Sequence, residues 1–191
     1  MMTQTEWDTK ATTYTNAWEF YNAKGIAAHE RLEKILDEYG VFTPDDEVLD
    51  IACGKGTLFL FAQKIMGPTG HIVAVDSSLE MLKFAQANAE QLGMAQQVTC
   101  VWADATTLPL DGQQFDKVVV FNAFPHFAAN QTQAIQHWAT FLKPGGSLFI
   151  IHSQSREKLN AMHEGKGFDI NVNALPTQHQ FSEMFTNAGL S

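Results

Sequence analysis

The chain has 191 residues, of which 45% are hydrophobic and 17% charged, so it can build the core of one domain but is too short for two of ordinary size. The net charge of −9, without any Lys/Arg cluster longer than two, argues against nucleic-acid binding, which needs a dense basic patch. The two cysteines, Cys53 and Cys100, form no C-x-x-C motif and indicate neither a disulfide framework nor a thiolate zinc site.

The N-terminal region lacks the charged segment and apolar core of a signal peptide. No apolar run approaches the roughly 20 residues that cross a bilayer. We therefore expect a cytoplasmic protein that has no membrane partner. Residues 29–40 then carry Leu32, Ile35, Leu36 and Tyr39 at helical spacing, which predicts a helix that covers a sheet.

Five apolar runs with little strict alternation follow, as is typical of strands buried on both faces of a parallel sheet. They span residues 47–53, 71–76, 97–104, 115–124 and 146–153. Helical patterns separate them, over residues 57–67, 77–93 and 131–146. Ser77 and Glu80 form a capping-box pattern at the start of the second helix, and Gly67 and Gly93 follow helix ends. This alternation predicts one doubly wound α/β domain.

The first strand–helix turn, Asp50-x-Ala52-x-Gly54-x-Gly56, is the expected ligand site, because ligands of such sheets bind beyond the carboxyl ends of the strands. A P-loop would need a lysine directly after its last glycine, and none follows Gly56. A dinucleotide fingerprint would need a small residue where Phe59 stands, and Phe59 obstructs the close helix approach that a pyrophosphate requires. Neither phosphate-binding motif is therefore present.

The run "DIACGKG" (50–56) resembles the first motif of class I S-adenosylmethionine-dependent methyltransferases, D/E-x-G-x-G-x-G, with Ala52 in place of the first glycine. Further runs resemble other motifs of that family in order: "WDTKATTY" (7–14), "ADATTLPL" (103–110), "FDKVVVFNAFPHF" (115–127) and "LKPGGSLFI" (142–150). The resemblance covers nearly the whole chain. It implies a Rossmann-like, mostly parallel sheet of about five strands in the order 3-2-1-4-5.

The resemblance also implies that S-adenosylmethionine is the cofactor and S-adenosylhomocysteine its product. The positions expected to bind it are Tyr14, Asp50, Ala52, Cys53, Gly54, Gly56, Asp76, Ser77, Met81, Asp104, Ala105, Phe121 and Asn122. An acid in the place of Asp76 can accept both ribose hydroxyls, although Asp76 could instead be a helix N-cap. Asp104 matches the acid that binds the adenine amino group, although it could be a turn residue. We expect Cys53 to be a small buried residue and no nucleophile.

Three histidines, His126, His152 and His163, are the candidate catalytic residues. The first two follow neighbouring strands, and His163 follows Arg156 and Asn160 on one face of a helix that Ser155 could cap. One hypothesis is a general base, since histidine titrates near neutral pH. A metal site is a second, and a hydrogen-bonding network that shapes the pocket is a third.

We interpret residues 1–191 as a single methyltransferase domain, with an N-terminal helical lid over 1–40 and a substrate-side insertion over 154–176. Family members usually add strands six and seven, which this chain is expected to lack. The fifth strand would then be an exposed apolar edge. Either the chain is truncated, or a homodimer covers this edge.

The expected reaction is in-line methyl transfer to a small molecule held in an apolar pocket. Two alternatives remain open at this point. One is a protein that binds S-adenosylmethionine without catalysis, and the other is an NAD-dependent oxidoreductase.

Overall fold

The computed structural model describes residues 3–11, 26–110, 112–165 and 174–191. Its centre is a sheet of five strands: β1 Glu47–Ile51, β2 His71–Asp76, β3 Val98–Trp102, β4 Phe115–Phe121 and β5 Leu142–Ile151. The strands lie in the order β3-β2-β1-β4-β5, and all four neighbouring pairs are parallel. The predicted fold class and strand order are confirmed.

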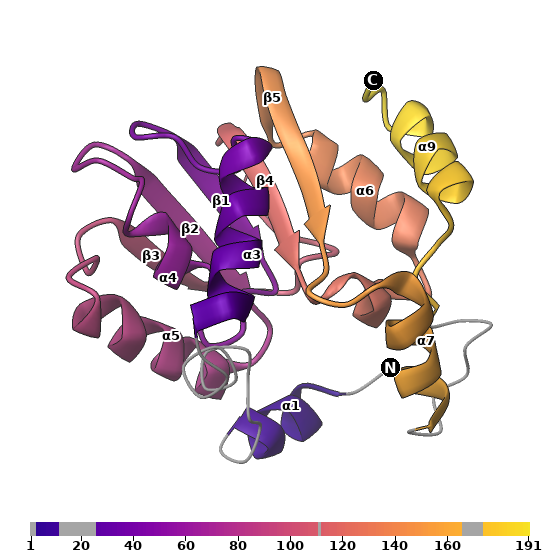
Figure 1. Ribbon diagram of the computed structural model, residues 1–191, viewed down its shortest axis with the longest axis horizontal. Helices are drawn as coiled ribbons and strands as arrows, with labels where there is room; N and C mark the ends of the chain where they lie inside the picture. Colours follow the sequence, from indigo (N-terminus) through magenta and orange to yellow (C-terminus); the bar gives the residue numbers. More distant parts are fainter. Residues whose placement is uncertain (1–2, 12–25, 111, 166–173) are drawn as a thin grey trace.

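Helices cover both faces of this sheet (Figure 1). They are α1 Gln4–Ala11, α3 Ile26–Glu38, α4 Phe59–Ala62, α5 Leu79–Gln91, the 3₁₀ helix η1 Phe124–Phe127, α6 Gln131–Ala139, α7 Arg156–Gly165 and α9 Gln178–Asn187. One core packs α3, α4 and α5 on one face, and a second core packs α6 and α9 on the other. Both faces of β1 are thus buried, since Val48 joins the first core and Leu49 the second, which explains its uninterrupted apolar run.

All five strands end at the same edge of the sheet, because they are parallel. This carboxyl edge is the lower one in Figure 1, where α1 and α7 also lie. No helix in the described part of the chain is long and apolar enough to cross a membrane.

Three local predictions about helices are wrong. The helix predicted over 57–67 is reduced to α4, and the Gly67 N–H donates to the Pro44 carbonyl instead of ending a helix. The N-cap of α5 is Ser78 and not Ser77, because the Ser78 hydroxyl accepts from the Met81 N–H. Gly93, with a φ of 73°, does follow the end of α5.

The third error concerns the segment 131–146, which was predicted as one helix. α6 ends at Ala139, and β5 begins at Leu142 and runs through Pro144 and Gly145. A register shift opposite Phe115–Lys117 accommodates the extra residues. Among the described residues β5 pairs only with β4, which makes it an edge strand of this sheet, where proline is tolerated.

Candidate functional site

The turn after β1 is built from backbone conformations that favour glycine. Ala52, Gly54 and Gly56 have φ values of 54°, 56° and 78°, all in the left-handed region. Only small residues are comfortable there, and Ala52 is an uncommon case among residues other than glycine. The Cys53 N–H donates to the Val75 carbonyl at 2.9 Å and so ties the turn to β2.

The ring of Phe59 lies directly against this turn. A Cβ atom placed on Gly56 would come within 2.2 Å of Cε2 of Phe59, whose side chain is fully buried. The space that a small residue leaves open in a dinucleotide site is therefore filled by an aromatic ring.

Asp50 is the most unusual polar group of the site. It is only 2% exposed, and neither carboxylate oxygen has a hydrogen-bond partner among the residues that the structure describes. Burial, reinforced by the negative charge of Asp76, raises the pKa of the Asp50 carboxyl well above its usual range. Buried carboxylates without donors are costly, which points to a ligand that supplies one.

Asp76 ends β2 and joins the turn to α5. One carboxylate oxygen accepts from the Gly54 N–H and the other from the Ser78 N–H, both at 2.9 Å. Burial raises the pKa of the Asp76 carboxyl above its usual range, and it outweighs the two hydrogen bonds, which lower the pKa. Each oxygen can accept a second hydrogen bond. The alternative that Asp76 is the N-cap of α5 is wrong, because Ser78 has that place.

Next to Asp76, β3 ends in a turn around Asp104. The exposed Asp104 carboxylate accepts from the Thr106 N–H at 2.8 Å and from its hydroxyl at 2.7 Å, so one of its oxygens has the turn role that the sequence left open. Ala105 is buried, and its carbonyl accepts from the Trp138 indole at 2.8 Å.

Around these acids, Met81 is buried and Ser77 is exposed. The Ser77 carbonyl accepts from the indole of Trp102 at 3.0 Å, and Trp102 is 57% exposed. Sequence reasoning missed this ring, although a large aromatic at the end of a strand pointing to the ligand edge is a signal. Cys53 is buried, which raises the pKa of its thiol and leaves little thiolate.

At the ends of β4 and β5, Asn122 has a φ of 54° and ties the two strands together. Its N–H donates to the Ile151 carbonyl, and its side-chain oxygen accepts from the Ser153 N–H, both at 2.8 Å. Phe121, next to it, is almost fully buried. Asn122 therefore shapes the segment that carries the second candidate histidine.

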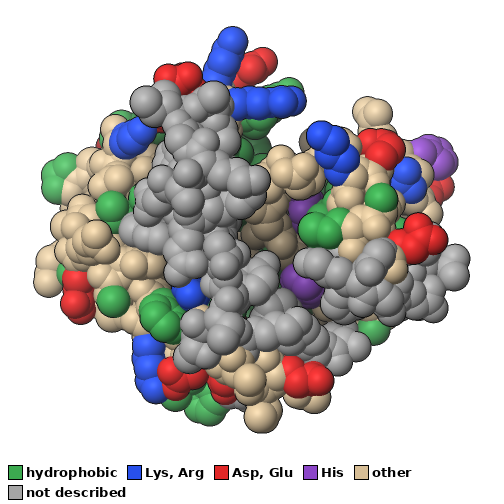
Figure 2. All heavy atoms as spheres, turned by 60° about the horizontal axis from the view of Figure 1, so that its bottom comes forward, with side chains coloured by type: hydrophobic (Ala, Val, Ile, Leu, Met, Phe, Trp, Pro, Cys, Tyr) green, Lys and Arg blue, Asp and Glu red, His purple; other side chains and the backbone are tan. Residues whose placement is uncertain are grey.

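His126 lies in η1 and His152 directly follows β5, so both are at the carboxyl edge and both are half-buried. Figure 2, which brings this edge forward, shows histidine side chains beside a hollow in the surface. The side chain of His163 and the whole of Tyr14 lie outside the described residues. Within the described part of the chain, no group of three His, Cys, Asp or Glu side chains could hold a metal ion.

The face of α7 that carries Arg156 and Asn160 is occupied by hydrogen bonds. Arg156 Nε donates to the Leu175 carbonyl, and the Asn160 side-chain oxygen accepts from the Leu175 N–H, both at 2.9 Å. The Ser155 hydroxyl accepts from the Lys158 N–H at 3.4 Å and caps the helix. For Arg156 and Asn160 the geometry favours the hypothesis of a hydrogen-bonding network that shapes the pocket.

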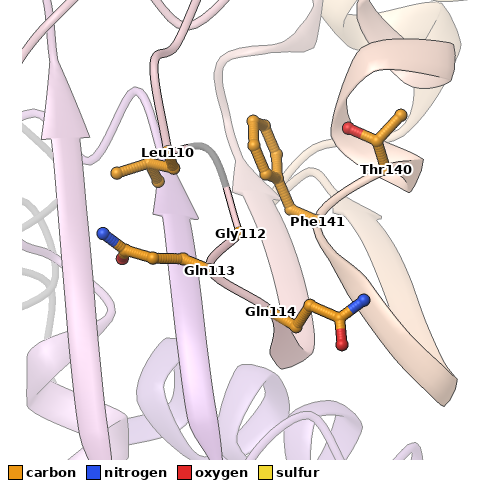
Figure 3. Close-up of a pocket in the computed structure, with 6 residues that line it drawn as sticks. All are labelled: Leu110, Gly112, Gln113, Gln114, Thr140 and Phe141. Atoms are coloured by element: carbon orange, nitrogen blue, oxygen red, sulfur yellow. The ribbon is translucent and has the colours of Figure 1, made fainter.

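A second hollow lies at the opposite edge of the sheet (Figure 3). Its cavity of about 370 Å³ is lined by Leu110, Gly112, Gln113, Gln114, Thr140 and Phe141, which precede β4 and β5. None of the predicted site residues lines it, so the carboxyl edge remains the candidate site.

Comparisons with known proteins identify the family of the chain. A family model described as "Methyltransferase domain" matches residues 48–146. The chain is 32% identical over 123 residues to the ubiquinone/menaquinone biosynthesis C-methyltransferase UbiE of Ectopseudomonas mendocina, covering 64% of this chain and 48% of that protein. The UbiE of Pseudomonas putida (strain GB-1) is 35% identical over the same shares. The chain thus spans about half the length of the curated relatives it matches.

Solved structures show the same fold. A SAM-dependent methyltransferase from Aquifex aeolicus superposes with a TM-score of 0.68 at 20% identity, covering 95% of this chain and 87% of that one. A SAM-dependent methyltransferase from Geobacter sulfurreducens, solved with S-adenosyl-L-homocysteine, has a TM-score of 0.53 at 24% identity, covering 66% and 47%. At these identities the likeness shows the fold alone.

Proposed function

The chain belongs to the methyltransferase domain family, whose model matches more than half of it, and from this premise we propose that it is an S-adenosylmethionine-dependent methyltransferase acting on a small molecule. The class I resemblance of its motifs is confirmed at the level of the family and the fold.

The observation that carries the proposal is the unpartnered carboxylate of Asp50. S-Adenosylmethionine has an ammonium group that can supply the missing donors and opposite charge. The left-handed turn from Ala52 to Gly56 lets the backbone approach the ligand without side-chain obstruction. No phosphate is needed to satisfy this site, whereas an anion beside Asp50 would be repelled.

The neighbouring residues fit the rest of this cofactor. Asp76 has acceptor capacity left for the ribose hydroxyls. Met81 and the turn at Asp104 and Ala105 are the proposed adenine contacts. When bound, the cofactor supplies an activated methyl group. The chain's own part is to hold the acceptor in line with that methyl and to exclude water.

The acceptor would enter at the carboxyl edge of the sheet, where His126 lies in η1 and His152 follows β5. We propose that one of them accepts a proton at an imidazole nitrogen if the acceptor must lose one. The curated relatives are C-methyltransferases of quinone biosynthesis by name. This supports an acceptor that loses a proton, because methylation at carbon releases one. A cytoplasmic location, a homodimer through β5, and roles for Tyr14 and His163 remain predictions.

Among the alternatives, an NAD-dependent oxidoreductase is disfavoured by Phe59, which fills the space beside Gly56. A protein that binds the cofactor without catalysis would show binding but no methyl transfer to any small acceptor.

Isothermal titration with S-adenosylmethionine, S-adenosylhomocysteine and NAD tests the proposal. We expect the first two to bind and NAD not to bind. Asp76→Ala should weaken binding by roughly 10- to 100-fold, because hydrogen bonds to a charged group are worth about 1.5–3 kcal/mol. Asp37→Ala, which changes an exposed aspartate of α3, is the matched control and should bind normally. Binding of NAD alone would overturn the proposal.

A further inference from the structure

A chain of hydrogen bonds connects the N-terminal helix to the glycine turn. Asp8 of α1 accepts from the hydroxyl of Ser78, the N-cap of α5. The Ser78 N–H donates to one oxygen of Asp76, and the other oxygen of Asp76 accepts from the Gly54 N–H. Asp8 and Ser78 are 70 residues apart in the sequence, so this chain links segments that are joined by no local structure.

Ser78 is the junction of this chain. It is completely buried, and its hydroxyl accepts from the Met81 N–H while it donates to Asp8. Its one hydroxyl proton is therefore directed to Asp8, and its backbone N–H to Asp76. The Ser78 hydroxyl thus uses its one proton for the contact with Asp8, and its oxygen accepts in the helix cap.

Among the described residues, polar contacts join α1 to the start of α5. The helix has the sequence QTEWDTKA, and of its described side chains only Ala11 is buried. Asp8 also accepts from the Glu80 N–H at 3.4 Å. Its carboxylate therefore lies at the N-terminus of α5, where free N–H groups and the helix dipole favour a negative charge.

The same contact places two carboxylates close together. Asp8 acts on Asp76 with a like charge, which is unfavourable unless donors hold both groups. Ser78 supplies such donors to both, through its hydroxyl and its N–H. A loss of Asp8 would leave the Ser78 hydroxyl without its acceptor and would release α1 from the edge where Asp76 lies.

We propose that Asp8 is a positioning residue for the cofactor site, which acts through Ser78 on the carboxylate of Asp76 and through it on the Gly54 turn. The inference rests on the proposed function, because it takes this edge to be the cofactor site. The affinity for the cofactor would then depend on Asp8, a side chain of α1 that need not touch the cofactor.

The test is calorimetric titration of the full chain with S-adenosylhomocysteine. Asp8→Ala should weaken binding roughly tenfold, as expected for the loss of one charge-assisted hydrogen bond. Asp8→Asn keeps an acceptor oxygen and should restore binding to within about threefold of the unmodified chain. Thr5→Ala, an exposed change on the same helix, is the control and should have no effect.

A double-mutant cycle separates the link through Ser78 from a general weakening of the fold. In the Ser78→Ala background, Asp8→Ala should change the affinity by less than about twofold, because the two residues act through one hydrogen bond. A full tenfold loss in that background, or normal binding by Asp8→Ala alone, would overturn the inference and leave the proposed function standing.

Hydrogen exchange of the ligand-free protein distinguishes a failure of this inference from a failure of the proposed function. If the unmodified chain does not bind S-adenosylhomocysteine, the proposed function fails. The coupling is then decided by peptides that cover residues 50–56. Faster exchange there in Asp8→Ala but not in Thr5→Ala supports it, and unchanged exchange rejects it.

Discussion

Replacing Asp50 with asparagine should make the ligand-free protein more stable and weaken binding at the proposed cofactor site. The Asp50 carboxylate is 2% exposed and lacks hydrogen-bond partners in the described part of the chain. The like charge of Asp76 adds to the cost of this burial. Asparagine has nearly the same shape but no charge, so it removes the larger part of the burial cost.

The size of the gain follows from that cost. Asparagine would still leave a buried polar group without partners, at a cost of about 1–3 kcal/mol, but it removes the additional cost of the charge, which is of similar size. We therefore expect Asp50→Asn to raise the free energy of unfolding by about 1–3 kcal/mol at pH 7. For a chain of this size, each kcal/mol corresponds to a Tm shift of about 2–4 °C.

The gain should depend on pH with a defined sign. The pKa of Asp50 is raised in the folded state, so the folded state keeps its proton at pH values where the unfolded chain has lost it. Stability therefore falls as the pH rises above the unfolded pKa of about 3.9, by up to about 1.4 kcal/mol per pH unit, until Asp50 ionises in the folded state as well. Below pH 4 the two proteins should differ least.

Thermal unfolding of both proteins at pH 4, 5.5, 7 and 8.5 measures this difference. The advantage of Asp50→Asn should grow with pH and then level off. With saturating S-adenosylhomocysteine the unmodified chain should gain more Tm than the variant, because the ligand binds only the intact site tightly. A variant that is less stable at every pH would show that Asp50 has stabilising partners, and would refute the reasoning.

Two further changes and one control substitution test the packing around the site. Gly56→Ala should destabilise the protein by about 2 kcal/mol or more in urea unfolding, because a Cβ would clash with Phe59 at a φ of 78°. Gly93→Ala, which has a similar φ of 73° but open space, should cost only about 1 kcal/mol; equal losses would rule out the clash. Trp138→Phe should cost about 1–3 kcal/mol, since it leaves the buried Ala105 carbonyl without its donor; an unchanged urea midpoint would contradict this role.

The sheet could be predicted from the sequence because its signals are local. Each strand is a short apolar run, and the motifs around Asp50 and Asp76 stand at the ends of two of them. The helix boundaries were less accurate for a physical reason. Pro144 and Gly145 fell within the helix predicted over 131–146, but they lie in an edge strand, which tolerates them within its own length. Whether such a segment ends a helix or begins a strand depends on its pairing with β4, which a local sequence pattern does not show.

The site could be predicted only in part. The sequence places Asp50 and Asp76 at one edge, but it does not show that one lacks partners while the other holds two N–H groups. Asp8 was visible in the quoted N-terminal motif without any role, because its partner Ser78 lies 70 residues away. Contacts at that distance leave no periodicity in the sequence. They become visible only when the fold brings α1 to the start of α5.

The charges at the carboxyl edge argue for the class of ligand independently of the family. The charge of Asp76 raises the pKa of Asp50, and the charge of Asp8 acts on the pKa of Asp76 in the same direction. A pyrophosphate at this turn would add further negative charge beside a buried carboxylate that has no donor, and the cost would be several kcal/mol in a poorly solvated site. A ligand with an ammonium group does the opposite, because it supplies both the donor and the charge that Asp50 lacks. On the proposed function, the acids that make the ligand-free edge unfavourable are therefore the groups that would select a cationic nucleoside over a dinucleotide.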